Sequence, residues 1–272
     1  MTVKSAPGIA AGAVFDRLAS TYDRTFTESL IGRAQRHAVW RQLLKTFKRN
    51  DNLLELNCGT GEDAFFLASQ GISVFACDAS QNMITRAEQR LAHISPAPPV
   101  VFCHLPTERL GELAPVQRFD GVFSNFSGLN CIADLAPIAL NLSALVKPGD
   151  PLLLCLSTRI CLIELFYYLC RFNPAKAFRR VCGRSKAVIE GAPLTVFYPT
   201  LRQIRRAFTP HFRLRSHIGI GVAIPPSYLE PWVRRHPTSF RVLCALERFL
   251  ASVPVLRTTG DHVLLCFEKV TP

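Results

Sequence analysis

The stretch LLELNCGTGEDAFFLA, from Leu53 to Ala68, places an acidic residue, Glu55, and two glycines where one apolar run gives way to another. The first run predicts a buried strand and the second a helix, so Glu55 lies on the strand and Gly59 and Gly61 lie in the turn that follows. Glycine permits a tight turn and lets a ligand lie against bare backbone. The first turn of a helix presents free N–H groups. The stretch therefore predicts a ligand site where a strand becomes a helix.

Two ligands compete for this turn. The letters GTGEDA fit a permitted form of the dinucleotide fingerprint, and the acid Asp78 follows at the distance that NAD binding requires. Glu55 argues against NAD, because a carboxylate near a pyrophosphate gains little. S-adenosylmethionine carries a sulfonium and an α-ammonium group and no phosphate, so a carboxylate at the turn suits it. The residues favour S-adenosylmethionine, and an NAD-dependent oxidoreductase is the alternative.

The elements that position this turn alternate in type along the chain. Apolar runs predict strands at 52–57, 72–77, 99–104, 119–125 and 151–157, and helical patterns lie near 61–70, 80–93, 107–113 and 133–146. Further on, a helix is expected at 200–208 and strands near 211–218 and 262–268. This alternation predicts a Rossmann-like, doubly wound α/β sheet, mostly parallel with an antiparallel last strand.

One domain with additions is expected, rather than two independent domains. Its expected parts are an N-terminal helical lid (1–50), a cofactor-binding core (51–157), a substrate-covering insert with a helix and a hairpin (158–200), and the end of the core (201–272) with a helical insertion (225–253).

The segments ELNCGTG, VFACDAS and FDGVFSNFSGLN together resemble the class I S-adenosylmethionine-dependent methyltransferases, from Phe15 to Ser157. FDRLASTYD is similar to the N-terminal helix of small-molecule members, whose tyrosine covers the cofactor. The resemblance implies that residues of the turn wrap the methionine part, that residues after the second and third strands bind the adenosine, and that residues after the fourth lie near the methyl group. The cofactor-binding residues so implied are Tyr22, Glu55, Asn57, Cys58, Gly59, Thr60, Gly61, Asp78, Ala79, Ser80, Met83, His104, Leu105, Pro106, Ser124, Asn125 and Phe126.

The acceptor of the methyl group is marked less clearly. His37 and Tyr198 are the candidates for catalysis, and Arg159, Glu164 and Tyr198 are the candidates for substrate contact. The fourth-strand tip, SNFSG, lacks the Asn/Asp-Pro-Pro-aromatic sequence of amino-methylating nucleic-acid enzymes. The prediction is methyl transfer to a small, apolar biosynthetic metabolite, with an anionic group on it as one option. The alternatives are an RNA or protein methyltransferase and a non-catalytic S-adenosylmethionine-binding subunit.

Positive charge is concentrated in one segment. The net charge is +12, and the segment from Thr158 to Arg215 holds twelve Lys/Arg against Glu164 and Glu190. Such a segment fits a solubilising surface, an anionic substrate, an acidic membrane surface or nucleic acid. Because no RNA-binding signature accompanies it, nucleic acid is not the expected partner. The most apolar stretch, Leu152 to Cys170, is interrupted by charges, so a spanning helix is not expected.

The ten cysteines show no C-x-x-C pair, which argues against a zinc site. Cys77, Cys155 and Cys266 lie inside apolar runs and are expected to be buried, reduced thiols of a cytoplasmic protein. The N-terminal run APGIAAGAVF leads directly into a charged helical pattern, so a cleaved signal peptide is not expected.

Overall fold

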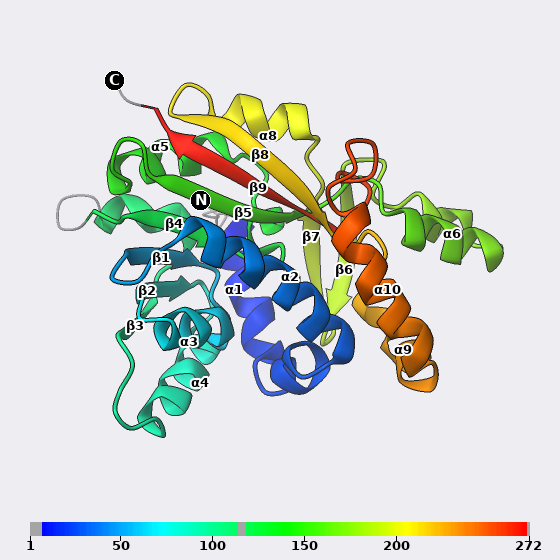
Figure 1. The fold of residues 1–272 in the computed structure, drawn as a ribbon, viewed down its shortest axis with the longest axis horizontal. Helices are drawn as coiled ribbons and strands as arrows, with labels where there is room; N and C mark the ends of the chain where they lie inside the picture. Colours follow the sequence, from blue (N-terminus) through cyan, green and yellow to red (C-terminus); the bar gives the residue numbers. More distant parts are fainter. Residues whose placement is uncertain (1–6, 114–117, 271–272) are drawn as a thin grey trace, which may run out of the picture.

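A seven-stranded sheet forms the centre of the protein in a computed structural model that describes residues 7–113 and 118–270 (Figure 1). The strand order is β3-β2-β1-β4-β5-β9-β8. The strands are β1 (Asn52–Leu56), β2 (Ser73–Asp78), β3 (Val100–His104), β4 (Gly121–Ser124), β5 (Pro151–Ser157), β8 (Phe212–Ile220) and β9 (His262–Lys269). This is the expected Rossmann-like fold.

The last strand reverses direction, as expected. β1 to β5 pair in parallel, whereas β9 pairs antiparallel with both β5 and β8. Ser157, at the end of β5, lies opposite His262, at the start of β9. The first residue of β9 therefore lies at the edge of the sheet where the parallel strands end, which is where ligands bind in this type of fold.

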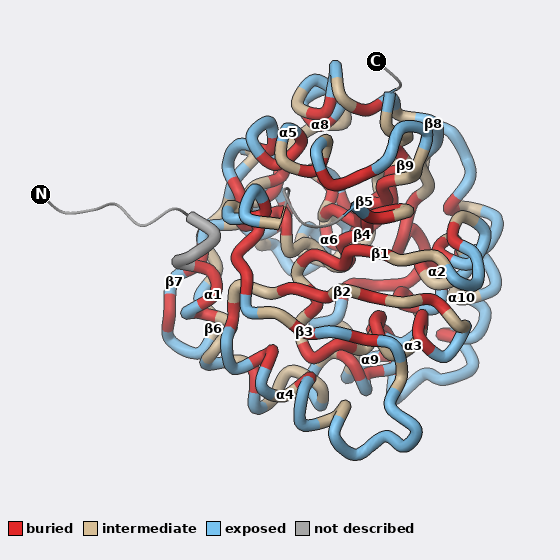
Figure 2. Tube along the Cα trace, turned by 90° about the vertical axis from the view of Figure 1, so that its left-hand side faces the viewer, coloured by how far each residue is buried: buried red, intermediate tan, exposed pale blue. Residues whose placement is uncertain are grey.

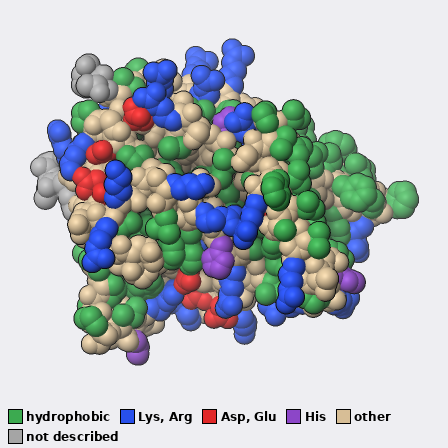
Figure 3. Space-filling model, viewed as in Figure 1, with side chains coloured by type: hydrophobic (Ala, Val, Ile, Leu, Met, Phe, Trp, Pro, Cys, Tyr) green, Lys and Arg blue, Asp and Glu red, His purple; other side chains and the backbone are tan. Residues whose placement is uncertain are grey.

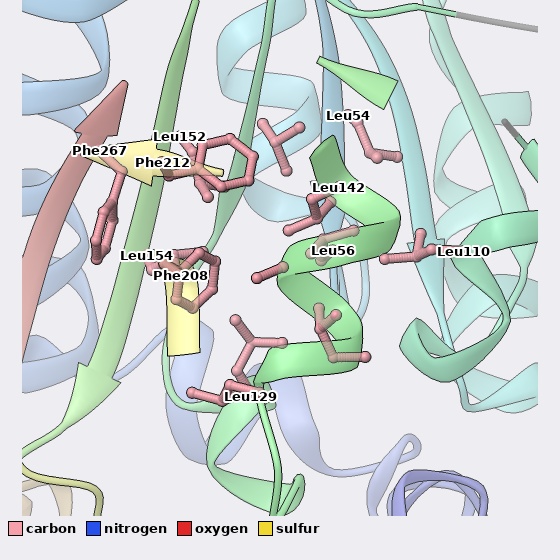
Figure 4. Packing of buried hydrophobic residues seen from close by; sticks show 14 of the residues in the cluster. Leu54, Leu56, Leu110, Leu129, Leu142, Leu152, Leu154, Phe208, Phe212 and Phe267 are labelled. Atoms are coloured by element: carbon pink, nitrogen blue, oxygen red, sulfur yellow. The ribbon is translucent and has the colours of Figure 1, made fainter. Parts of the chain in front are cut away.

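Helices cover both faces of the sheet. Side chains of a strand alternate between faces, so Leu53 packs with α2 (Leu30–Thr46), α3 (Glu62–Ser69) and α4 (Gln81–Ala92). Leu54 and Leu56 pack with α5 (Ala136–Leu145) and α8 (Leu201–Phe208) on the other face (Figure 4). The central strands β1, β4 and β5 are buried along most of their length, and the exposed segments are mainly loops and outer helix turns (Figure 2).

Two predicted elements differ in detail from the structure. The fourth strand is shorter than 119–125, because only Gly121–Ser124 pairs with both neighbours. The stretch Thr107–Leu113 is a 3-10 helix, η2. Before the sheet, α1 (Pro7–Leu18) is followed by a short π-helical turn, η1 (Asp23–Thr27).

The segment after β5 adds structure at the edge where the parallel strands end. It comprises α6 (Leu162–Cys170), α7 (Pro174–Ala177) and a hairpin of β6 (Arg184–Ile189) and β7 (Ala192–Phe197), close to where a hairpin is predicted. Ala11 and Val14 of α1 pack against Ala192 and Leu194 of β7. After β8 come η4 (Ser227–Leu229), α9 (Glu230–Arg235) and α10 (Pro237–Leu250), and a short η3 (Gly128–Cys131) follows β4.

The cysteines fit the expected pattern in part. All ten lie within the described residues and are free thiols, and Cys77 and Cys155 are buried, whereas Cys266 is partly exposed. Burial raises the pKa of the Cys155 thiol to about 12. Among residues 7–113 and 118–270, no helix combines the length and the apolar character that crossing a bilayer requires.

Candidate functional site

The turn after β1 has the backbone geometry that its glycines predict. Asn57, Gly59 and Gly61 all have positive φ, a region that favours glycine. A Cβ atom on Gly61 would lie 2.6 Å from the ring of Phe102, so this position has no room for a side chain. At Gly59 a Cβ would meet only Tyr22, at 3.7 Å, so this side of the turn is open.

Asp78 ties this turn to the end of β2. Its carboxylate accepts a hydrogen bond from the Gly59 N–H at 2.9 Å and another from the Ser80 N–H at 2.8 Å. Burial raises the pKa of Asp78, although these two N–H groups oppose the shift. Each oxygen has a further lone pair, so the carboxylate can also accept bonds from a ligand hydroxyl.

A cavity, here called the first cavity, opens over the turn. Eight of the seventeen predicted cofactor residues line it: Tyr22, Asn57, Gly59, Asp78, Ala79, Met83, Asn125 and Phe126. The other lining residues were not among the predicted ones, and they come from α1, η2 and the segment around η3: Ala11, Gly12, Phe15, Thr107, Glu108, Gly128, Cys131 and Ile132. Most of them are apolar or small, and none belongs to a short motif that would mark it in the sequence.

The N-terminal segment closes one side of the first cavity. Asp16 of α1 accepts hydrogen bonds from the Ser80 hydroxyl at 2.6 Å and from the Asn82 N–H at 2.9 Å. The Thr60 hydroxyl donates to Asp23 at 2.6 Å. Tyr22 lies between these two attachments, and burial raises the pKa of its phenol to about 12. Two polar anchors therefore hold the predicted lid against the core.

The remaining predicted cofactor residues lie around the first cavity without lining it. Glu55 is buried beneath the turn; its Oε2 has no hydrogen-bond partner among the described residues, and burial raises its pKa well above the ordinary value. The Ser124 hydroxyl donates to Asn57 Oδ1 at 3.2 Å. His104 is exposed, with its Nε2 3.0 Å from the Ala79 carbonyl oxygen. The other predicted cofactor residues are buried near the first cavity: Cys58, Thr60, Gly61, Ser80, Leu105 and Pro106.

A buried polar network supports Asn125 at the edge of the first cavity. Asp63 accepts hydrogen bonds from Asn125 at 3.0 Å and from the Trp40 indole at 2.6 Å, and it pairs with Arg36 at 2.7 Å. The Arg36 guanidinium lies 5.0 Å from the ring centroid of Phe126. Arg36 and Asp63 are both nearly inaccessible to solvent, so the ion pair is a fixed part of the wall.

A second cavity adjoins the first. The two share three wall residues, Phe15, Tyr22 and Phe126. The second cavity is also lined by residues of η1, the segment after α7, the loop before η4 and the start of β9: Leu18, Thr25, Phe26, Ser127, Arg179, Arg180, Pro226, Ser227, Tyr228, Asp261 and His262. It therefore combines an aromatic wall with a group of charged residues.

The charged residues of the second cavity form one buried network. Arg180 pairs with Asp261 at 2.8 Å and with Glu164 at 2.8 Å, and Arg179 also binds Glu164. Burial opposes the charge on Asp261, but the charges of His262 and Arg180 outweigh it and lower its pKa. Glu164 behaves similarly, because hydrogen bonds from Arg179 and Arg180 offset its burial and leave the pKa lowered.

His262 is the one histidine in this network. It is buried, and its Nδ1 lies 3.6 Å from Asp261 Oδ2, beyond hydrogen-bond range. That nitrogen has no hydrogen-bond partner among the described residues. Burial lowers the pKa of His262. The imidazole is therefore neutral near pH 7 and able to accept a proton.

The predicted acceptor-site residues lie in different places. Glu164 lies behind the second cavity, held by Arg179 and Arg180. Tyr198 is buried, and its carbonyl accepts a bond from Arg159 Nε at 3.0 Å. Neither Arg159 nor Tyr198 lines the two cavities, and His37 is exposed on α2.

The position of His262 near the ligand-binding edge follows from a sequence pattern, although His262 was not among the predicted site residues. Asp261 and His262 directly precede the apolar run that predicts the last strand. An antiparallel last strand must begin at the edge where the parallel strands end. A polar pair before it therefore lies at the ligand-binding edge.

The family comparison concerns the part of the chain that contains β1 to β4. A family model described as a methyltransferase domain matches residues 54–150. The chain is 30% identical over 143 residues to the demethylmenaquinone methyltransferase of Clavibacter sepedonicus, which covers 53% of this chain and 56% of that protein. It is 28% identical over 147 residues to the 2-phytyl-1,4-naphtoquinone methyltransferase of Synechococcus elongatus, over 52% of this chain and 60% of that protein. The chain thus spans less than two thirds of the length of these curated relatives.

Solved structures share the fold over more of the chain. An S-adenosylmethionine-dependent methyltransferase from Methanosarcina mazei superposes with a TM-score of 0.57 and 15% identity, over 85% of this chain and 98% of that one. At this identity the likeness concerns the fold.

Proposed function

We propose that the chain is a class I S-adenosylmethionine-dependent methyltransferase that methylates a small, largely apolar molecule held in the second cavity; a methyltransferase domain model matches residues 54–150. The observation that carries this proposal is the junction of the two cavities at Phe15, Tyr22 and Phe126. The first cavity has the residues that a cofactor of this family requires. The second has aromatic walls and a buried histidine, and it opens at the same junction.

The first cavity fits S-adenosylmethionine rather than NAD. Asp78 presents a carboxylate to the ribose hydroxyls, and Gly59 leaves the backbone open beside it. Glu55 keeps a buried Oε2 without a partner among the described residues below the turn, and this oxygen can accept a hydrogen bond from a donor on the ligand, which a pyrophosphate does not offer. Bound there, the cofactor supplies an electrophilic methyl group.

The residues of the second cavity hold and orient the acceptor. Phe26, Phe126 and Tyr228 offer apolar surfaces on which a flat ring can pack. Methyl transfer depends mainly on placing the acceptor atom in line with the methyl group. The walls at Tyr22 and Phe126 exclude water from the junction, which favours a reaction between a cation and a neutral or anionic acceptor.

His262 supplies the base in this proposal. Its Nε2 would accept the proton of an acceptor hydroxyl, which would leave the acceptor nucleophilic toward the methyl group that the bound cofactor would supply. Asp261 then stabilises the imidazolium, because its carboxylate lies 3.6 Å from Nδ1 and a small movement would form a hydrogen bond. The proton leaves to solvent after product release.

A first acceptor to test follows from the relatives. The curated relatives act on demethylmenaquinone and 2-phytyl-1,4-naphtoquinone according to their names. A naphthoquinone is reduced to its quinol before it can act as a nucleophile, and the quinol hydroxyl is then a proton donor for His262. We infer that a quinol or a similar hydroxylated ring fits the aromatic second cavity.

Labelled-methyl transfer from S-adenosylmethionine tests the proposal. The acceptors are reduced 1,4-naphthoquinone and reduced 2-phytyl-1,4-naphthoquinone, the second presented in vesicles. His262→Ala should lower kcat by about 10²–10⁴-fold, the usual contribution of a general base. S-adenosylhomocysteine affinity, measured by calorimetry, should not change. The matched control is His37→Ala, which removes an exposed histidine from α2.

Two results would contradict the assignment. Equal loss in both histidine variants would remove His262 from catalysis. Binding of NAD with no binding of S-adenosylhomocysteine would remove the methyltransferase activity itself. A further readout is the pKa of His262 by NMR, which should lie below 6.5, the ordinary value.

The basic segment gives weaker support to an RNA acceptor. Its arginines are dispersed over the fold. Arg179 and Arg180 are bound to Glu164, Arg159 is bound to the Tyr198 carbonyl, Arg215 pairs with Glu268, and the exposed ones of α8 lie on another part of the fold. An RNA site is expected to gather them in one continuous patch near the methyl group. The small-molecule proposal is therefore preferred.

A further inference from the structure

The exposed side of α6 is apolar. Leu162, Phe166 and Leu169 recur at the spacing of one helical face, and all three are exposed. Phe166 is 72% exposed, and Phe172, just beyond the helix, is 94% exposed. The only charged residue of α6, Glu164, points inward to Arg179 and Arg180. This arrangement is the reverse of an ordinary surface helix, which turns its apolar side to the core.

α10 continues this surface. Val242, Leu246 and Phe249 form a second exposed stripe at helical spacing, and Phe249 is 74% exposed. Figure 3 shows hydrophobic side chains gathered over α6 and α10, at the end of the molecule opposite β1 to β4. The exposed residues of the two stripes, together with Phe172, are here called the apolar face. An exposed apolar patch of this kind marks an interaction surface.

The surroundings of the apolar face are basic. Residues 160–182 and 225–257 contain nine Lys/Arg and three acids. Each acid is already bonded within the protein: Glu164 binds Arg179 and Arg180, Glu230 accepts from N–H groups of α2 and pairs with Arg234, and Glu247 accepts from four N–H groups of residues 221–224. The exposed cations around the face are Arg171, Lys176, Arg234, Arg235, Arg241 and Arg248.

A groove beside this surface adjoins the second cavity. It runs between α6 and α9–α10 and is lined mainly by apolar residues, among them Ile163, Trp232 and Leu243. Tyr228 lines both the groove and the second cavity. Its hydroxyl donates to Glu164 Oε2 at 3.4 Å, so it stands between the apolar groove and the charged network.

We propose that the apolar face docks the protein on an anionic lipid bilayer. The phenyl rings of Phe166, Phe172 and Phe249 would enter the boundary between headgroups and acyl chains, and the surrounding arginines would bind anionic headgroups. A second copy of the chain fits less well, because a symmetric contact would bring two basic rims together. The role of the groove rests on the proposed function: an acceptor with an apolar tail would pass along it from the bilayer toward the second cavity.

Trp232 provides a direct probe of docking. It lies in the groove and is partly exposed, whereas Trp40, the other tryptophan, is stacked on Phe66 with a ring separation of 3.8 Å. In Trp40→Phe protein, vesicles containing phosphatidylglycerol should shift the emission to the blue, and brominated acyl chains should quench it. Vesicles of phosphatidylcholine alone should bind at least tenfold more weakly, as judged by the lipid concentration needed for the same change in emission. Trp232→Phe protein should show neither change.

Co-sedimentation with the same vesicles tests the face. Phe166→Glu should weaken partitioning by tenfold or more. The matched control, Leu140→Glu, changes an apolar residue of α5 that is 56% exposed and should bind normally. Phe166→Glu should also lower kcat/KM at least tenfold for the phytylated quinol in vesicles and leave it unchanged for the tail-less quinol in solution. S-adenosylhomocysteine affinity should be equal in all variants.

Three outcomes would overturn the docking proposal. The first is no preference for anionic vesicles, and the second is equal partitioning of the Phe166→Glu and Leu140→Glu proteins. The third is a dimer, seen by light scattering, that Phe166→Glu separates, because the apolar face would then be an interface between copies. Vesicle binding without S-adenosylhomocysteine binding would refute the proposed function and leave docking supported.

Discussion

The two cavities meet at the same edge of the sheet but are built by different means. The first rests on backbone: a glycine turn, N–H groups held by Asp78, and small residues of α1. The second rests on side chains that are far apart in the sequence, chiefly Glu164, Arg180 and Asp261, which are joined by buried ion pairs. The geometry of the first cavity should therefore survive substitution of the side chains around it, whereas the geometry of the second should depend on each member of the ion-pair network.

The largest effect is expected from breaking that network. Arg180→Ala removes the partner of both Glu164 and Asp261 and leaves two buried carboxylates less well compensated. Loss of one partner from a buried pair costs about 3–5 kcal/mol. Urea unfolding should show a free energy of unfolding lower by this amount. Arg184→Ala, at an exposed arginine of β6, is the control and should be nearly neutral.

Retained stability in the Arg180→Ala protein would mean that Arg179 replaces it. The double variant Arg179→Ala/Arg180→Ala distinguishes the cases. If it too is as stable as wild type, then the network is not what supports the second cavity, and the contrast with the first cavity fails.

A smaller effect is expected at the first cavity. Asp78→Ala removes an anion that holds the Gly59 and Ser80 N–H groups and faces the ligand. Hydrogen bonds to a charged group contribute about 1.5–3 kcal/mol, so S-adenosylhomocysteine should bind roughly 10- to 150-fold more weakly by calorimetry. Asp78→Asn, which keeps one acceptor oxygen, should lose less. Equal affinity of wild type and Asp78→Ala would place the ribose elsewhere.

The pH dependence of the free energy of unfolding should reflect the protonation of three groups at the second cavity: Glu164, Asp261 and His262. The pKa values of Glu164 and Asp261 are lowered in the fold, so the stability they contribute is present above their ordinary values of 4.5 and 3.8 and is lost as the pH falls through the folded values. The pKa of His262 is also lowered, so the unfolded state gains a proton first and stability falls as the pH drops below 6.5. All three shifts act in the same direction.

Thermal unfolding between pH 3 and 8 should therefore show a fall in Tm on the acid side. The free energy of unfolding should fall there by about 1.4 kcal/mol for each unit of pKa shift. In the His262→Ala protein the part of the fall near pH 6 should disappear, and the part below pH 4.5 should remain. A wild-type Tm that is flat from pH 8 to 4 would contradict the charged state assigned to the network.

The same contrast explains what could be predicted from the sequence. The strands, their order of appearance and the glycine turn follow from local patterns, because period and turn chemistry are written in adjacent residues. Gly59 and Asp78 were predicted because a short motif carries them. Arg180, Tyr228 and His262 were missed because no local pattern joins them, and the topology of the last strand and the insert brings them together.

Arg159 shows the limit of a prediction based on charge. It is in the same basic segment as Arg180 and follows β5 directly, so the sequence offered it as a substrate residue. In the structure its guanidinium binds the Tyr198 carbonyl at 3.0 Å and Gln203 at 3.4 Å and lines neither cavity. The number of cations in a segment does not indicate which of them faces a ligand.

The smallest effect is therefore expected at Arg159. Arg159→Ala removes a partly exposed side chain and its bond to the hairpin, which should reduce the free energy of unfolding by about 0.5–1.5 kcal/mol, as for one hydrogen bond. The kcat/KM for the tail-less quinol should change by less than about threefold, since no contact with the acceptor is lost. Arg180→Met measured beside it, at a temperature where both proteins are folded, should reduce kcat/KM by tenfold or more, because Asp261 loses the cation that orients it beside His262. Matched losses in the two variants would show that charge in the segment, and not position in the second cavity, governs the acceptor.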